Sequence, residues 1–179
     1  MTTHVALIRG INVGGHKLVG MADLREMLTA LGFAGARSLL QSGNLIFQGR
    51  TKSAPRLEAM LEAEARKRLA LQADFFIRTA DELKAVVDGN PFPREAARDP
   101  ARLVVVFLKT APDAKAVETL RAAISGPEVI EARGRHAYIV YPMGMGRSRL
   151  TGALIEKKLA TRGTARNWNT VLKLSALVC

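Results

Sequence analysis

The order of its apolar segments constrains the fold of this chain more than any other feature of the sequence. Segments rich in β-branched and other apolar residues alternate with segments whose apolar residues recur at helical spacing. In chain order, the first half predicts a strand, a helix, two strands, a helix and a strand, over residues 4–11, 21–31, 36–41, 44–48, 57–69 and 73–78. This βαββαβ order is that of the ferredoxin-like fold, in which two helices cover one face of a four-stranded antiparallel sheet.

The second half of the chain predicts a similar order of elements. The capping box Thr79-Ala80-Asp81-Glu82 begins a short helix, and Asn90-Pro91-Phe92-Pro93 ends it. Strands are then expected at residues 102–109, 128–132 and 136–141 and helices near 117–124 and 150–160, and the order ends in a segment near 163–168 and a C-terminal helix near 170–178. No repeat of individual residues is visible, so the duplication is predicted from the order of elements.

The predicted organisation is an α+β fold built from two units. Residues 1–78 form the first ferredoxin-like unit, and residues 79–179 form a second, related unit that ends in a helix. Antiparallel sheets with helices packed on them are expected in both. A chain of 179 residues buries roughly 70% of its unfolded surface, so this fold needs neither disulfides nor metal for stability.

The cysteine content and the N-terminus favour a cytoplasmic protein. Cys179 is the single cysteine, so no disulfide framework exists and a reducing compartment is favoured. The first residues lack the basic and apolar regions of a secretory signal peptide. No apolar stretch approaches the roughly 20 residues that span a bilayer, so no membrane partner is expected.

The formal net charge of +11 is concentrated at the two ends of the chain. Residues 133–179 hold nine Lys and Arg against one acid, Glu156, and residues 1–50 hold five against two. Such a field attracts polyanions such as nucleic acid, and also nucleotides. A basic surface that only keeps the protein dispersed is the alternative explanation.

A glycine-rich loop, Arg9-Gly10-Ile11-Asn12-Val13-Gly14-Gly15-His16-Lys17, follows the first strand. Glycines after a strand let backbone amides approach an anion, and Lys17 adds a positive charge. The phosphate-loop pattern requires Lys directly after its second glycine and then Ser or Thr, and His16 and Leu18 depart from it. The loop is therefore either a turn or a looser anion-binding loop.

Two further segments gather polar side chains. Gln41-Ser42-Gly43-Asn44 is either a tight hairpin turn or a set of hydrogen-bonding groups beside the glycine-rich loop. Arg166-Asn167-Trp168-Asn169-Thr170 contains the only tryptophan. Asn169 as a helix cap and Trp168 as a core residue explain two of its five residues, which leaves Arg166 and Asn167 as candidates for a site.

The patterns of common catalytic and metal sites are missing from the sequence. His4, His16 and His136 lie far apart without the spacing of metal ligands, and no CxxC, HExxH or GxSxG motif occurs. We therefore predict no metal and no cofactor. The aromatic content is 5%, and the strand at 4–11 has no aromatic residue with which an RNA-binding sheet stacks bases.

The three polar segments resemble the hallmarks of a bacterial family, the Domain of Unknown Function 1697 family. These are Arg9-Gly10-Ile11-Asn12-Val13-Gly14-Gly15, Gln41-Ser42-Gly43-Asn44 and Arg166-Asn167-Trp168-Asn169-Thr170, which fall in order along essentially the whole chain. The resemblance implies an α+β fold of ferredoxin-like character. It implies no activity, because none is established for the family.

The sequence leaves three function classes open. The first is an anion-binding protein whose ligand is a nucleotide, a phosphorylated metabolite or a nucleic-acid backbone, the second an enzyme acting on a small anionic substrate, and the third a regulatory or partner-binding protein without a small ligand. For the first, we expect the glycine-rich loop and residues 166–170 to lie side by side in one cleft bordered by the hairpin turn. The candidate ligand-binding residues are Arg9, Asn12, Gly14, Gly15, Lys17, Ser42, Asn44, Arg166, Asn167, Asn169 and Thr170.

Overall fold

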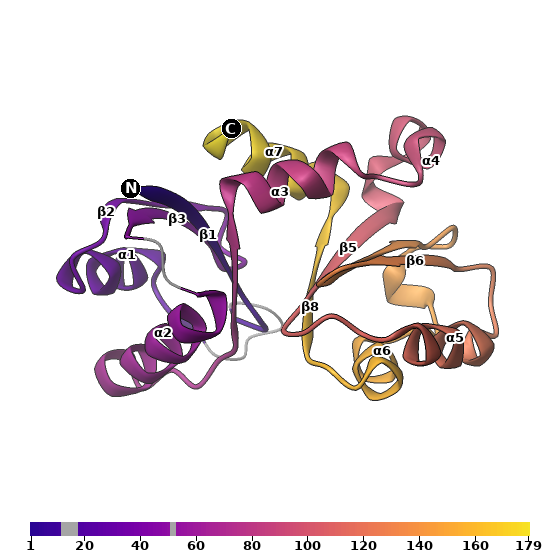
Figure 1. The fold of residues 1–179 in the computed structure, drawn as a ribbon, viewed down its shortest axis with the longest axis horizontal. Helices are drawn as coiled ribbons and strands as arrows, with labels where there is room; N and C mark the ends of the chain where they lie inside the picture. Colours follow the sequence, from indigo (N-terminus) through magenta and orange to yellow (C-terminus); the bar gives the residue numbers. More distant parts are fainter. Residues whose placement is uncertain (12–17, 51–52) are drawn as a thin grey trace. The chain divides into compact units, whose positions relative to one another are not determined.

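A computed structural model describes residues 1–11, 18–50 and 53–179 (Figure 1). The chain divides into two compact units. The first unit comprises residues 1–84 together with 174–179, and the second comprises residues 85–173. Each unit contains a four-stranded antiparallel sheet with helices, as the α+β fold class predicts.

The first unit has the predicted βαββαβ order. Its elements are β1 (Thr2–Ile8), α1 (Met21–Ala30), β2 (Ala34–Leu39), β3 (Asn44–Gly49), α2 (Ala54–Leu69) and β4 (Phe75–Thr79). The strands lie in the order β2-β3-β1-β4, with every neighbouring pair antiparallel. Helix α3 (Ala80–Asp88) follows and begins with the predicted capping box, in which the Glu82 amide donates to Thr79 Oγ1 and the Thr79 amide to Glu82 Oε2.

The second unit repeats this order and confirms the duplication. After α4 (Pro93–Arg98) and the 3-10 turn η1 (Pro100–Arg102), its strands lie in the order β6-β7-β5-β8. Its remaining elements are β5 (Leu103–Leu108), α5 (Ala114–Ala123), β6 (Val129–Arg133), β7 (His136–Val140), η2 (Met145–Arg147), α6 (Gly152–Leu159), β8 (Gly163–Asn167) and α7 (Trp168–Val178). Among the described residues, no helix has the length and apolar character needed to cross a membrane.

In each unit, alternate side chains of the central strand pack against the helices and form the core. In the first unit, Ala6 and Ile8 of β1 pack in one apolar cluster with residues of α1 and α2 such as Leu28 and Leu61. Their neighbours on the opposite sheet face are buried as well, and Val5 is fully inaccessible. A central strand buried on both faces has a nearly continuous apolar sequence, which is why residues 4–8 resemble a strand so clearly.

The second unit has a core of the same design. Val104 and Val106 of β5 share a cluster with Leu120 of α5 and Ile155 of α6. Figure 1 shows α5 and α6 along the same side of this sheet, as α1 and α2 lie along one side of the first. The helical spacing of the apolar residues therefore determines which face of each helix packs on its sheet.

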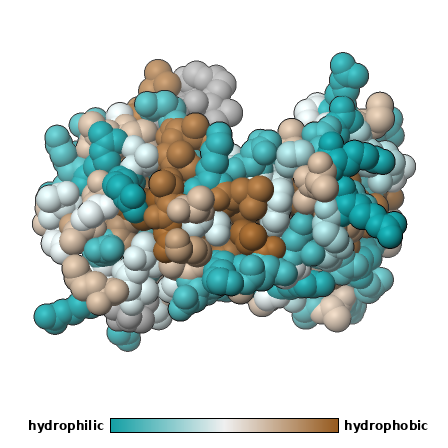
Figure 2. Space-filling view, turned by 90° about the horizontal axis from the view of Figure 1, so that it is seen from above, coloured by the Kyte–Doolittle hydropathy of each residue, from teal (hydrophilic) through white to brown (hydrophobic). Residues whose placement is uncertain are grey.

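Residues 174–179 belong to the first unit although they end the chain. Arg37 Nη2 of β2 donates to the Leu177 carbonyl at 3.2 Å, and Cys179 Sγ lies 3.7 Å from the Ala80 carbonyl. Helix α7 also exposes apolar side chains, with Leu172 and Leu177 each about two-fifths exposed. Figure 2 views the molecule from the side on which α3 and α7 lie in Figure 1 and shows apolar side chains gathered there.

The duplication extends to individual residues at the edge strands β4 and β8. Arg78 and Arg166 occupy the same register position, opposite Val5 in β1 and Val105 in β5. Each arginine donates from Nη1 to the carbonyl of the preceding residue. The next residue caps a helix in both units, because Thr79 accepts the amide of Glu82 and Asn167 that of Thr170.

His4 of β1 is a buried histidine. It is 1% exposed and stacks near Phe47, with ring centroids 5.4 Å apart. Neither ring nitrogen has a hydrogen-bond partner in the part of the chain that the structure describes. Burial lowers the pKa of His4 from 6.5, and Glu82 opposes this shift. The folded protein therefore holds His4 neutral at pH 7.

This burial predicts that stability falls as the pH drops below about 6.5. The unfolded chain binds a proton at His4 near that pH, whereas the folded chain binds it only at the lower folded-state pKa. We expect His4→Leu to remove this loss and to raise the free energy of unfolding by about 1–3 kcal/mol, because no unsatisfied polar group remains. Urea unfolding at pH 5 and pH 7.5 measures both effects. A variant that is less stable than the natural protein by the same amount at both pH values would contradict this expectation.

Candidate functional site

Arg9 directly follows β1 and is the first residue of the glycine-rich loop. Its amide donates to the Asp74 carbonyl at 3.0 Å, and its Nη1 lies 3.8 Å from Asp74 Oδ2. The first candidate cation therefore stands beside a carboxylate. The remaining candidates of this loop, Asn12, Gly14, Gly15 and Lys17, lie outside the described residues.

The hairpin turn between β2 and β3 comprises residues 40–43, so β2 ends two residues earlier than predicted. The reason is Leu40, whose φ of 61° lies in the left-handed region and ends the extended strand. Asn44 is fully buried, and its Nδ2 donates to the Leu39 carbonyl at 2.9 Å and to Ser42 Oγ at 3.2 Å. The side chain of Asn44 thus stabilises the hairpin itself.

The same turn lies against the end of β1. The Ile8 amide donates to the Gly43 carbonyl at 2.8 Å, and Gly43 has a φ of 86°. A shallow groove of about 470 Å³ is lined by Gln41 of this turn and by residues 18–20, which follow the glycine-rich loop. The hairpin and the described part of the loop are therefore neighbours in the first unit.

The C-terminal candidate segment forms the corner between β8 and α7. Asn167 Oδ1 accepts the amide of Thr170 at 3.0 Å, so the helix cap is Asn167 and not Asn169, which is exposed. The helix begins at Trp168, two residues before its predicted start, and the cap moves with it. Trp168 is 5% exposed and its ring lies 6.5 Å from that of Tyr138, which confirms its expected burial.

Arg166 is a partly buried cation at this corner. Its register partner Val105 alternates with Val104 and Val106, which face α5 and α6, so Arg166 lies on the opposite sheet face. Its Nη1 donates to Thr164 Oγ1 and to the Ala165 carbonyl, both at 2.9 Å. Burial lowers the pKa of Arg166 to about 10, and the side chain remains protonated at neutral pH.

Backbone hydrogen bonds bring three further basic residues to the end of β5, and they are not among the predicted candidates. The Lys109 amide donates to the Arg162 carbonyl at 3.0 Å, and the Leu108 amide donates to the Arg135 carbonyl at 2.8 Å. Lys109, Arg135 and Arg162, which we name the β5-end cluster, come from three separate segments. The signal for them was indirect: Lys109 follows its buried strand as Arg9 follows β1.

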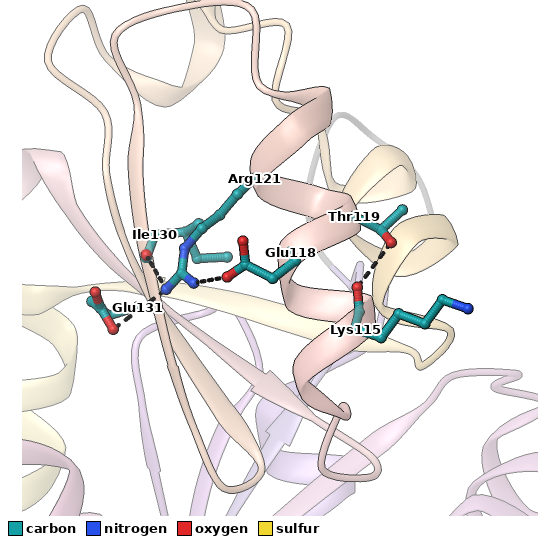
Figure 3. A network of polar contacts seen from close by, with 6 residues as sticks. All are labelled: Lys115, Glu118, Thr119, Arg121, Ile130 and Glu131. Carbon is teal, nitrogen blue, oxygen red and sulfur yellow. Dashed lines mark hydrogen bonds and ion pairs between the residues drawn. The ribbon is translucent and has the colours of Figure 1, made fainter.

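Most carboxylates of the second unit have a partner within that unit. Residues 85–173 hold fifteen Lys and Arg against eight Asp and Glu. Figure 3 shows Arg121 of α5 bound to Glu118, the Ile130 carbonyl and Glu131. Further acids with a partner in this unit include Asp99 with Arg102, Asp113 with the Ala116 amide, Glu128 with Ser148 and Glu156 with the Gly163 amide.

The candidate residues thus fall into separate groups in the two units. Arg9, Ser42 and Asn44 lie in the first unit, and residues 166–170 lie in the second. A single cleft that combines residues of both groups stays a prediction.

The fold and these strand ends define a duplicated ferredoxin-like α+β protein with a basic second unit. The model of the family described as "Protein of unknown function (DUF1697)" matches residues 1–138, and the chain belongs to this family. A comparison with curated proteins gives no match. Among solved structures, a conserved bacterial protein from Streptococcus pneumoniae is similar, with 24% sequence identity, a TM-score of 0.75 and 99% of each chain covered. That likeness supports the fold alone.

Proposed function

We propose that this protein recognises an anionic, phosphate-bearing ligand through Arg166 at the β8–α7 corner. The observation that carries the proposal is the placement of this guanidinium, because Thr164 Oγ1 and the Ala165 carbonyl each accept from its Nη1 at 2.9 Å. Burial also lowers the pKa of this guanidinium to about 10. Perturbed pKa values of this kind occur preferentially at functional sites.

The surroundings of Arg166 support an anion as its ligand. The second unit carries a net charge of +7, and six of its eight carboxylates have the partners named above. Thr164 Oγ1 and the Ala165 carbonyl hold Nη1 in place, so the guanidinium is oriented before a ligand arrives. An oriented guanidinium offers the planar set of donors that matches phosphate.

A thermal-shift screen can identify the ligand class, and a substitution of Arg166 tests the proposed site. Nucleotides, phosphorylated metabolites and inorganic pyrophosphate form the screen, because a ligand at a hundred times its Kd adds about 2.7 kcal/mol of stability. For a ligand found in this way, we expect Arg166→Gln to weaken binding about tenfold or more, since a hydrogen bond to a charged group contributes about 1.5–3 kcal/mol. Calorimetric titration measures this change.

The control is Arg98→Gln, which removes the same charge from an exposed position on α4. It should leave the Kd nearly unchanged. Arg166→Lys retains the charge and tests whether the planar donors are needed. If Arg166→Gln stays folded and binds as the natural protein does, the proposed site is wrong. If no phosphate-bearing compound stabilises the protein, the proposed function is wrong.

A further inference from the structure

A loop of the second unit exposes two apolar side chains next to two cations. Residues 143–149, which we name the Met-Arg loop, lie between β7 and α6. Met143 is 60% exposed and Met145 is 40% exposed. Arg147 and Arg149 follow them and are exposed as well. Within the described residues, neither arginine forms an ion pair.

Hydrogen bonds fix the conformation of the Met-Arg loop. At its two ends, the buried Tyr141 donates its hydroxyl to the Leu150 carbonyl at 3.0 Å. Ser148 Oγ donates to Glu128 Oε1 and accepts the Leu150 amide at 2.9 Å. Gly144 has a φ of 84°, and its amide donates to the Tyr141 carbonyl at 2.9 Å. The methionines are therefore presented by a well-bonded loop, and compact loops of this kind are frequently functional.

The composition of the Met-Arg loop is typical of a protein–protein interface. Methionine and arginine are enriched at such interfaces and lysine is depleted, and the loop contains no lysine. Methionine also adapts its shape to an apolar partner surface. Arginines without an ion pair are complemented by carboxylates on that surface. The partner should therefore combine an apolar hollow with acidic side chains.

The first unit contains a groove with this chemistry, lined by residues of α1 and of the C-terminal end of α2. This α1–α2 groove has a volume of about 370 Å³, and Met27, Ala30 and Leu69 supply its apolar lining. Asp23 and Glu26 line it too and are exposed. In the part of the chain that the structure describes, neither carboxylate forms an ion pair.

The one cation that lines the α1–α2 groove does not reverse its charge. Arg68 Nε lies 2.7 Å from Glu64 Oε2, so this pair is neutral. Asp23 lies in the first turn of α1, where a negative charge stabilises the helix, but Glu26 lies beyond that turn and lacks this explanation. The groove thus carries two negative charges in a protein whose formal net charge is +11.

We propose that the Met-Arg loop of one copy of this protein docks in the α1–α2 groove of a second copy. The methionines contact the apolar lining, and the two arginines pair with Asp23 and Glu26. A loop of this size is much smaller than the roughly 20–30 residues a side of a standard interface, so the association is weak and concentration-dependent. The contact does not involve Arg166, and the inference therefore goes beyond the proposed function.

The test reverses the charges of each surface in turn. Arg147→Glu/Arg149→Glu gives the loop the sign of the groove, and Asp23→Lys/Glu26→Lys gives the groove the sign of the loop. Sedimentation velocity over a range of protein concentrations at low salt measures association. Each variant alone should associate about tenfold more weakly or less, because like charges meet. An equimolar mixture should associate again, since every loop then finds a groove of opposite sign on the other variant.

The control Arg94→Glu/Arg98→Glu makes the same charge change at exposed positions of α4 and should associate as the natural protein does. Met143→Ser/Met145→Ser leaves the charge unchanged and should also weaken association, because it removes the apolar contact. Far-UV circular dichroism checks that each variant folds. If the double groove variant does not fold, Glu26→Lys alone replaces it.

Three outcomes would overturn the inference. The first is a natural protein that stays monomeric at every concentration. The second is a mixture of the two charge-reversed variants that fails to associate, which would show that the loop and the groove are not partners. The third is a control variant that loses association as fully as the loop variant does, because net charge alone would then explain the loss.

Discussion

Replacing Trp168 by alanine should lower the free energy of unfolding by about 3–5 kcal/mol. Trp168 begins α7, is 5% exposed and packs near Tyr138. Tyr138 is itself fully buried, donates its hydroxyl to the Val86 carbonyl and has its pKa raised to about 12 by burial. The substitution removes the bulky indole side chain and leaves a cavity beside the buried hydroxyl group of Tyr138.

Urea unfolding followed by far-UV circular dichroism measures this loss without relying on tryptophan fluorescence. Trp168→Phe is the matched control, because it retains an aromatic ring and should lose much less stability. An alanine variant with the stability of the natural protein and no affinity for the anionic ligand would instead identify Trp168 as a stacking surface.

We expect Gly43→Ala to destabilise the protein by about 2–5 kcal/mol, for two reasons. Gly43 has a φ of 86°, a conformation that costs a residue with a Cβ about 1–2 kcal/mol. A Cβ built there also lies 2.9 Å from Ile11 Cγ1 and 3.0 Å from Ile8 Cβ, and such overpacking costs about 1–3 kcal/mol. Ile8 belongs to a central strand and cannot move aside.

Gly134→Ala separates the two contributions. Gly134 lies in the equivalent hairpin turn, between β6 and β7, and has a φ of 56°. A Cβ at this position meets nothing within 4 Å, so only the backbone cost of about 1–2 kcal/mol is expected. Thermal unfolding of both variants gives the difference. Equal losses would show that the contact with Ile8 and Ile11 contributes nothing.

Periodicity was sufficient to predict the two βαββαβ units, because their cores are made by alternating strand residues and helical stripes. It could not predict α4, since none of the residues of that helix is buried and no apolar stripe exists. The early end of β2 was missed for a different reason. A left-handed Leu40 is unusual, and the sequence gives no sign that tertiary structure imposes it.

The candidate site was less predictable than the fold. Asn167 follows the usual preference for helix caps, but the start of α7 had to be known before the cap could be assigned. Lys109, Arg135 and Arg162 are separated by more than twenty residues, and only the pairing of β5 with its neighbours brings them together. The sequence alone does not show that Arg78 and Arg166 correspond in the two units, because different residue types surround them.

The division of the chain at residues 84 and 174 has a consequence for synthesis on the ribosome. The second unit is continuous in sequence, so all of its residues are available once Lys173 has emerged. The first unit begins earlier but lacks its last part until residues 174–179 are made, including Leu177, which accepts a hydrogen bond from Arg37. Translation usually favours folding from the N-terminus onward. Here the half that is translated first is the half that is completed last.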